Sequence, residues 1–246
     1  MFGFKTITKM RLVSRVGIGA TTLAISILLL FSYYGQQVGQ FTIDVGQELY
    51  LDNKMFISES VDFRESKSRL IAEPLGAVNP IGYIGYPEKI PIQVEAILDN
   101  LQGGNNNGKD FFAYTFYTKN AGEQDFSYNL SIYIDETQNH LDEAIRVMII
   151  KNYDITGENV ETEEVYAKKQ STLGKNPGSP EIGSIMFVNN KTVINENRYE
   201  FKKGQIDKYT VIMWVHGEDA DCIDIGERKI TDGLIKVSMK FSVITV

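Results

Sequence analysis

A long apolar segment near the N-terminus constrains this chain more than any other feature of its sequence. Residues 16–34 carry no charge, and four cations precede them: Lys5, Lys9, Arg11 and Arg15. At about 1.5 Å per residue, a helix over these 19 residues is about 28 Å long, which matches the hydrocarbon core of a bilayer. The cations predict that residues 1–15 are a cytoplasmic n-region and that the chain beyond the segment lies outside the cell.

The same segment also has features of a secretory leader, and two outcomes stay open. Its exit at residues 31–37 has no pair of small residues spaced for cleavage, and Tyr33 and Tyr34 suit the membrane interface. We therefore expect a retained signal-anchor at residues 16–34 and a single-pass protein of the cell membrane. Cleavage of the leader would instead release the remaining chain as a secreted protein.

The chain beyond the leader is acidic. Of the 25 Lys and Arg residues, four lie in the leader, whereas none of the 32 Asp and Glu residues does. The outer part thus has 21 cations against 32 anions, a formal charge of −11. This balance argues against a nucleic-acid partner and is compatible with bound cations or a cationic partner. Cys222 is the single cysteine, so no intramolecular disulfide can form and stability must come from an apolar core.

The outer part changes its character at a polar loop, residues 103–109. Before the loop, residues 35–110 are expected to form an irregular extension, because Gly and Pro residues interrupt short apolar runs. Within it we expect one short helix at 92–101 and short strands at 41–45, 55–57 and 69–71. Residues 111–246 are expected to form the β-sandwich domain, which this extension precedes.

Residues 111–246 show the alternation that is typical of half-buried strands. In 111–117 and 126–134, apolar and aromatic side chains recur at every second residue, which places them on one face. Further strands are expected at 144–150, 163–168, 184–189, 192–195, 207–215 and 233–244. Short strands without long intervening helices predict a mainly β protein: an antiparallel β-sandwich of jelly-roll or immunoglobulin-like type.

The sequence shows no catalytic constellation. His140 and His216 are the only histidines, neither belongs to an H-E-x-x-H pair, and we expect both in exposed loops. The nucleophile motif G-x-S-x-G and the glycine-rich phosphate-binding and dinucleotide-binding motifs are absent. We therefore predict a protein that is not an enzyme and has no catalytic or cofactor-binding residues.

The densest polar cluster follows the strand expected at 207–215. Its four carboxylates are Glu218, Asp219, Asp221 and Asp224. Carboxylate oxygens are the ligands that Ca²⁺ prefers, so these residues form a candidate calcium site, although their spacing is not that of an EF-hand loop. The alternative interpretation is a solvated acidic hairpin loop.

Three single residues carry structural expectations. Arg146 interrupts the apolar run at 144–150, where a lone charge is costly, so we expect an ion pair with Asp142, Glu143 or a neighbouring strand. Trp214 and Cys222 are expected to be buried and structural.

Several segments resemble uncharacterised surface proteins of Gram-positive bacteria. They are YTFYTKNAGEQDFSYNLSIYI (114–134), DEAIRVMIIKN (142–152), VYAKK (165–169), KYTVIMWVHGEDADCID (208–224) and GLIKVSMKFSV (233–243). With the leader in front of them, they resemble membrane-anchored surface proteins and, more remotely, are similar to the TasA/camelysin family of biofilm-matrix proteins. The resemblance implies a β-sandwich and a role in surface architecture, including fibre assembly. Camelysin is described as a metal-dependent protease, but no metal-ligand motif of this chain matches that activity.

These features together predict a non-enzymatic envelope protein. It would present its β-sandwich outside the cell for protein–protein interaction or self-assembly, for instance by pairing at sheet edges. One alternative is a surface receptor module that binds an ion or a small ligand. A second alternative is a camelysin-like metalloprotease.

Overall fold

A computed structural model describes residues 41–82, 90–223, 230 and 232–244. Residues Gly39–Val246 form one compact unit. None of the helices within the described stretches is long and apolar enough to cross a membrane. The expected n-region at 1–15 and signal-anchor at 16–34 lie outside the described residues, so both stay predictions.

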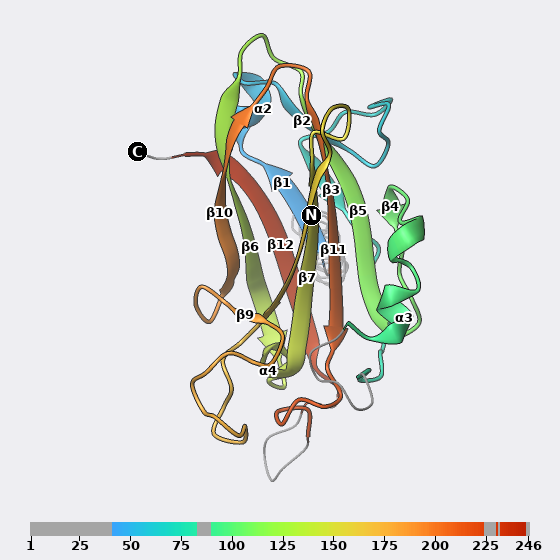
Figure 1. Ribbon diagram of the computed structural model, residues 1–246, viewed down its shortest axis with the longest axis vertical. Helices are drawn as coiled ribbons and strands as arrows, with labels where there is room; N and C mark the ends of the chain where they lie inside the picture. The colour runs from blue at the N-terminus through green and yellow to red at the C-terminus, as the bar shows by residue number, and fades with distance from the viewer. Residues whose placement is uncertain (1–40, 83–89, 224–229, 231, 245–246) are drawn as a thin grey trace, which may run out of the picture. The chain divides into compact units, whose positions relative to one another are not determined.

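The compact unit is mainly β and contains two sheets (Figure 1). Sheet A has the strand order β10 (Thr192–Phe201), β6 (Phe126–Gln138), β12 (Leu234–Val243), β1 (Phe41–Val45) and β3 (Arg69–Ile71). Sheet B has the order β2 (Met55–Ser58), β5 (Phe111–Asn120), β11 (Ile206–Val215), β7 (Ile145–Tyr153), β8 (Val160–Ala167) and β9 (Ile185–Met186), with β4 (Gly104–Asn105) also paired to β5. Neighbouring strands are antiparallel except for β1 with β12 and β8 with β9, which are parallel.

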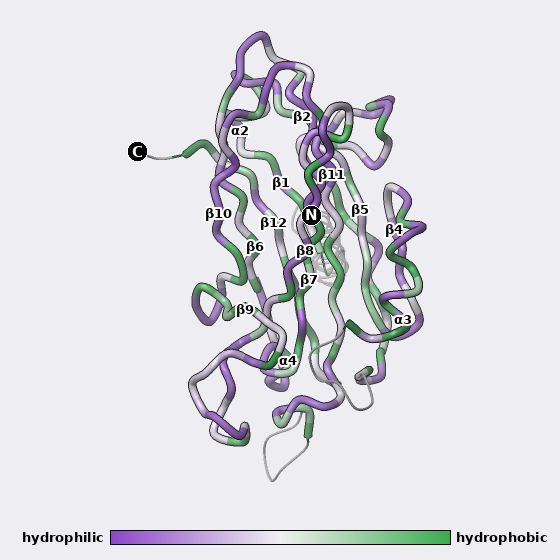
Figure 2. Tube along the Cα trace, in the orientation of Figure 1, coloured by the Kyte–Doolittle hydropathy of each residue, from purple (hydrophilic) through white to green (hydrophobic). Residues whose placement is uncertain are grey.

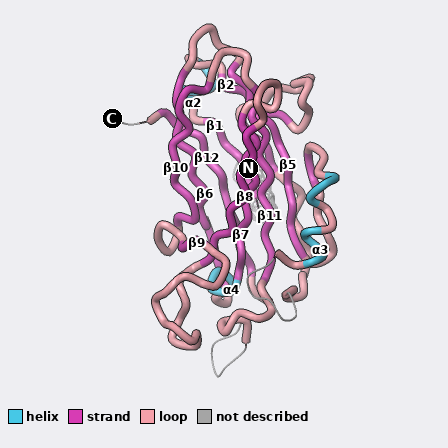
Figure 3. The backbone as a smooth tube through the Cα atoms, viewed as in Figure 1, coloured by secondary structure: helices cyan, strands magenta, loops and turns pink. Residues whose placement is uncertain are grey.

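Helices are short in the described part of the chain (Figure 3). They are α2 (Gln47–Leu51), α3 (Ile92–Glu95), the 3₁₀ turn η1 (Leu98–Asn100) and α4 (Leu141–Ala144). The single helix expected at 92–101 is thus replaced by α3 and η1. A segment this short is marginal as an independent helix, and α3 buries Val94 while it leaves Ile92 exposed.

The strands expected from the alternating pattern are confirmed, and several run further than predicted. β6, for example, begins at Phe126 as expected but continues to Gln138. The three strands expected within residues 35–110 are present as well, and they belong to the two sheets. β1 and β3 lie in sheet A and β2 lies in sheet B, so residues on both sides of the 103–109 loop build the core.

The two sheets share one apolar core that is rich in aromatic rings. Phe112, Tyr114 and Phe116 of β5 all face it, as their spacing predicts. Across the core, the ring centroid of Phe41 lies 5.4 Å from that of Phe112 and 6.2 Å from that of Tyr114. Full burial of one such side chain stabilises the fold by about 1.5–3 kcal/mol. In Figure 2 the second half of β11 is hydrophobic, whereas most of β10 is hydrophilic.

A second, smaller apolar cluster covers part of the outer face of sheet B. Trp214 is buried there, as expected, against Val94 of α3, which lies outside β5 in Figure 1. Cys222 is half-buried and packs against the main core. Among the described residues, neither apolar cluster extends over the outer face of sheet A.

A buried polar network joins the two sheets near the start of β11. Asp207 of sheet B accepts a hydrogen bond from Arg198 Nε of sheet A at 3.1 Å and from the backbone N–H of Asp154 at 2.8 Å. Beside it, the hydroxyl groups of Tyr128 and Tyr209 lie 2.6 Å apart and also connect the sheets. Burial raises the pKa of Asp207, against the lowering effect of the Asp154 N–H and the Arg198 guanidinium. The network therefore fixes how the two sheets are aligned.

Replacing Asp207 with Ala should lower the free energy of unfolding by about 3–5 kcal/mol, because it leaves Arg198 and a buried N–H without their partner. Urea denaturation of the full chain at neutral pH measures this change. As a control, Glu123→Ala removes the exposed ion pair with Lys203 and should leave the midpoint nearly unchanged. A loss of similar size in both variants would contradict the role assigned to Asp207.

Candidate functional site

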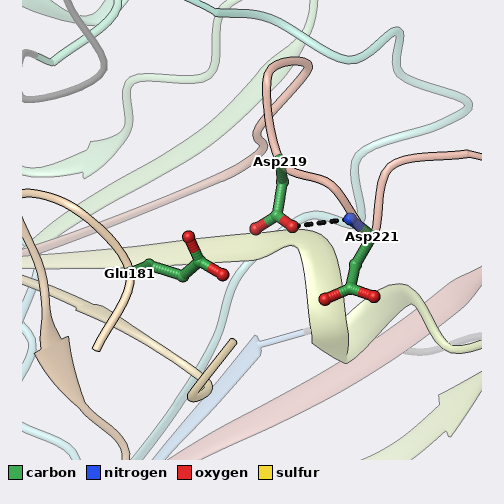
Figure 4. Close-up of side chains that lie close together, drawn as sticks. All are labelled: Glu181, Asp219 and Asp221. Carbon is green, nitrogen blue, oxygen red and sulfur yellow. Dashed lines mark hydrogen bonds between the residues drawn. The ribbon is translucent and has the colours of Figure 1, made fainter. Parts of the chain in front are cut away.

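The candidate site lies beyond the end of β11, where three segments meet. Arg146 comes from β7 and projects from the face of sheet B that is opposite the main core. The turn after β11 supplies Asp219 and Asp221, and the connection between β8 and β9 supplies Glu181. Figure 4 shows the three carboxylate side chains close together. Residues that are distant in the sequence therefore form one polar cluster.

Arg146 is the cationic centre of this cluster. Its Nη1 donates to Asp219 Oδ2 at 2.7 Å, and its Nη2 lies 3.6 Å from Glu181 Oε2. The side chains of Arg146 and Asp219 are 5% and 0% exposed. The ion pair expected for Arg146 is thus present, and its main partner follows the neighbouring strand β11.

The two nearby acids considered for Arg146 are engaged elsewhere. Both belong to α4, the short helical turn before β7, which separates them from the strand face that carries Arg146. Asp142 accepts a hydrogen bond from Thr137 Oγ1 at 3.0 Å and pairs with Lys168. Glu143 lies 3.7 Å from His140. Their position in α4, ahead of the first residue of β7, explains why closeness in sequence did not make them partners of Arg146.

Hydrogen bonds within the turn hold the two aspartates in place. Asp219 Oδ1 accepts from the backbone N–H of Asp221 at 2.8 Å, the dashed contact in Figure 4. Ser171 Oγ donates to Asp221 Oδ1 at 2.6 Å, and the N–H of Asp219 donates to the carbonyl of His216 at 3.1 Å. The carboxylates are therefore oriented by the fold itself.

Burial and neighbouring charges shift the pKa values of two groups at this site, Glu181 and His216. Burial raises the pKa of Glu181 to about 7, and Asp219 adds to the rise while Arg146 opposes it. Burial and, to a smaller extent, the charge of Arg146 together lower the pKa of His216 to about 4. At neutral pH, His216 is therefore neutral, and Glu181 holds a proton for part of the time.

His216 differs from the expectation that both histidines are exposed. It is only 5% exposed, and its Nδ1 has no hydrogen-bond partner within the described structure. His216 is buried because it forms a backbone bridge with Ile81, which continues the strand pairing one residue past the end of β11. His140 is exposed, as predicted, with 58% of its side chain accessible.

The three carboxylates have a spacing that suits a cation. Ligand oxygens of Glu181, Asp219 and Asp221 all lie within 4.8 Å of one another. Two oxygens that bind one Ca²⁺ at about 2.4 Å each lie at most about 4.8 Å apart, so the spacing is compatible with this ion. However, Arg146 already occupies one oxygen of Asp219 and would compete with a cation for it.

The structure brings together two of the four residues predicted for a calcium site. Asp219 and Asp221 belong to the cluster, whereas Glu218 lies outside it, beside Gly82. Asp224 lies outside the described residues. Glu181 was not predicted, because it comes from a separate segment and no local spacing indicates its approach. A polar pocket of about 250 Å³ adjoins the cluster and is lined by Arg146, Glu181, His216, Glu218 and Asp219, among others.

A second cavity, of about 400 Å³, is mostly apolar. Phe112, Ile145 and Met213 line it from the core side, and Asn79 and Asp232 add polar groups. Its size lies within the usual range for small-molecule pockets. The predicted alternative of a ligand-binding module thus has a physical candidate, and it stays a prediction.

Comparisons with family models, with curated proteins and with solved structures give no match to this chain. The resemblance to membrane-anchored surface proteins and to the TasA/camelysin family therefore stays a prediction. Arguments about function depend on the residues and geometry described above.

Proposed function

We propose that this protein is a non-enzymatic envelope protein that binds other protein chains, including copies of itself, through an edge of sheet B. The leader pattern at residues 16–34 supports a location in the cell membrane with the β body outside. The two-sheet arrangement supports a sandwich, and its jelly-roll or immunoglobulin-like form is part of the proposal. The observation that carries the proposal is the apolar character of the β9 edge.

The β9 edge, residues 182–188, exposes large apolar side chains at the end of sheet B. Ile185 and Met186 of β9 are 47% and 44% exposed. The flanking Ile182 and Val188 are 49% and 58% exposed. Because β9 is the terminal strand of sheet B, one of its sides presents backbone groups that do not pair within the sheet.

The neighbouring strand β8 shows how such an edge is usually protected. Charged side chains along an edge discourage pairing with another chain. β8 extends beyond its contact with β9 and carries Glu161, Glu163 and Glu164 along that part. β9 has no charged residue, so an incoming strand would meet both backbone groups and apolar side chains.

The double variant Ile185→Lys with Met186→Lys should weaken self-association of the full chain by tenfold or more, which corresponds to about 1.4 kcal/mol or more. Two charges on the edge repel their counterparts in a second copy and remove apolar contact area. Sedimentation velocity over a range of concentrations measures the change.

A matched control is Ile92→Lys, which adds a charge at a position of α3 that is 64% exposed and lies away from β9. This variant should associate like the unmodified chain. A full chain that stays strictly monomeric at high concentration would rule out self-association. Equal association in all three proteins would place the interface outside the β9 edge.

A second candidate function is the binding of a divalent cation by Glu181, Asp219 and Asp221. Their mutual spacing of at most 4.8 Å favours it. The protease alternative gains no support from this cluster, because neither histidine is part of it among the described residues.

Millimolar Ca²⁺ should raise the melting temperature of the full chain, and the increase should be larger at pH 8 than at pH 6. The pKa of Glu181 is raised to about 7, so binding at pH 6 has to displace a proton that is mostly absent at pH 8. Thermal denaturation of the Glu181→Gln variant should show a smaller increase, while Glu218→Gln should retain it. An unchanged melting temperature at both pH values would reject this site.

A further inference from the structure

The outer face of sheet A carries a group of amide, hydroxyl and phenol side chains, which we call the amide patch. It consists of Asn129 and Ser131 on β6 and of Asn195, Asn197 and Tyr199 on β10. In the register of these two strands, Asn195 stands opposite Ser131 and Asn197 stands opposite Asn129. The patch therefore extends across two hydrogen-bonded strands.

Hydrogen bonds among these side chains fix their orientations. Asn129 Nδ2 donates to Asn195 Oδ1 at 2.7 Å and to Asn197 Oδ1 at 2.9 Å. Ser131 Oγ donates to Asn129 Oδ1 at 2.8 Å, and Asn197 Nδ2 donates to the Tyr199 hydroxyl at 3.0 Å. The patch is thus ordered before any ligand arrives, which reduces the entropic cost of binding.

The patch keeps hydrogen-bonding capacity that faces solvent. Asn195 and Asn197 are exposed. The Oδ1 atom of Asn195 accepts hydrogen bonds from Asn129 and Ser131, whereas its Nδ2 group donates to no atom of the described structure. The side chain of Tyr199 is next to Asn197 and is 60% exposed. An approaching molecule would therefore meet amide donors and acceptors beside an accessible aromatic ring.

The strands themselves do not explain these residues. Asn is depleted in β-strands, where Thr, Val or aromatic residues are favoured. No core packing requires an amide at Asn195 or Asn197, because both side chains are exposed. The hydrogen bonds within the patch compensate for this only in part, because the Nδ2 group of Asn195 is left without a partner, and positions that break a local preference are expected at functional sites.

The surroundings of the patch favour an uncharged ligand. A shallow hollow of about 450 Å³ adjoins it, with Tyr133 and Ser242 as further lining residues. None of the residues that line this hollow in the described structure is charged, although the outer part of the chain has a formal charge of −11. Lys240, opposite Ser131, lies at its margin, with Nζ 5.5 Å from the ring centroid of Tyr133. The lining itself therefore offers hydrogen-bonding groups and no charge.

We propose that the amide patch binds a neutral saccharide chain. Sugar hydroxyl groups both donate and accept hydrogen bonds, as the amides do, and the apolar body of a tyrosine ring can pack on the C–H face of a sugar. An open hollow lined by residues of β6, β10 and β12 suits a stretch of chain better than a single enclosed sugar. This inference is independent of the β9 edge, which belongs to the other sheet.

Isothermal titration calorimetry of the full chain tests the proposal with maltohexaose, cellohexaose and chitohexaose as neutral probes. Any detergent used should lack a sugar head group. At least one neutral probe should bind, and the anionic hexagalacturonate should not. In the double variant Asn195→Thr with Asn197→Thr, the affinity should fall tenfold or more, while the melting temperature stays close to that of the unmodified chain, because the better strand propensity of Thr offsets the hydrogen bonds lost within the patch.

Two controls separate binding from folding and from the proposed function. Ile71→Thr changes an exposed residue of β3, at the opposite edge of sheet A, and should leave saccharide binding unchanged. The Ile185→Lys, Met186→Lys variant should also bind normally, whether or not the β9 edge mediates association. The proposal is overturned if no neutral hexasaccharide binds, if the Asn→Thr variant binds equally well, or if that variant loses binding only because its melting temperature falls.

Discussion

The parallel pairing of β1 with β12 is the contact on which the rest of sheet A depends. β6 covers one side of β12, and without β1 the other side would leave the core open. Phe41 and Ile43 fill this space and are fully buried, and Phe41 contacts the rings of β5 across the core. The first and last strands of the β body are therefore neighbours, so the sandwich closes only when nearly the whole outer chain is in place.

Polar contacts also join the two sheets to each other. Arg198 and Asp207 join the sheets inside, and Lys151 bridges Glu164 of β8 and Glu196 of β10 at 2.6 and 2.7 Å. The amide patch on sheet A lies apart from the other two surface features, whereas Glu181 of the carboxylate cluster directly precedes Ile182 of the β9 edge.

Local patterns in the sequence predicted the strands well, because successive side chains of β5 and β6 point alternately to the core and to the opposite face of the sheet. They could not predict which strands pair, since β1 and β12 lie at opposite ends of the outer chain. The approach of Glu181 to Asp219 and the burial of His216 beside Ile81 also could not be predicted, because each joins residues that are far apart in the sequence. For the same reason, the amide patch is visible only when the register places Asn129 beside Asn195 and Asn197. Contacts between distant segments are set by the tertiary fold, and no spacing rule encodes them.

Hydrogen exchange of the full chain tests the closure of the sandwich most directly. If β1 pairs with β12 throughout its length, the N–H groups on that side of β1 should exchange as slowly as those of β12. They belong to Thr42, Asp44 and Gly46, and the N–H of Gly46 donates to the carbonyl of Phe241. The exposed residues Thr172 and Lys175, whose N–H groups have no hydrogen-bond partner in the described structure, give the rate expected for free backbone. Exchange of Thr42, Asp44 and Gly46 at that rate, with β12 still protected, would show that the first strand does not pair with β12 and would contradict the account.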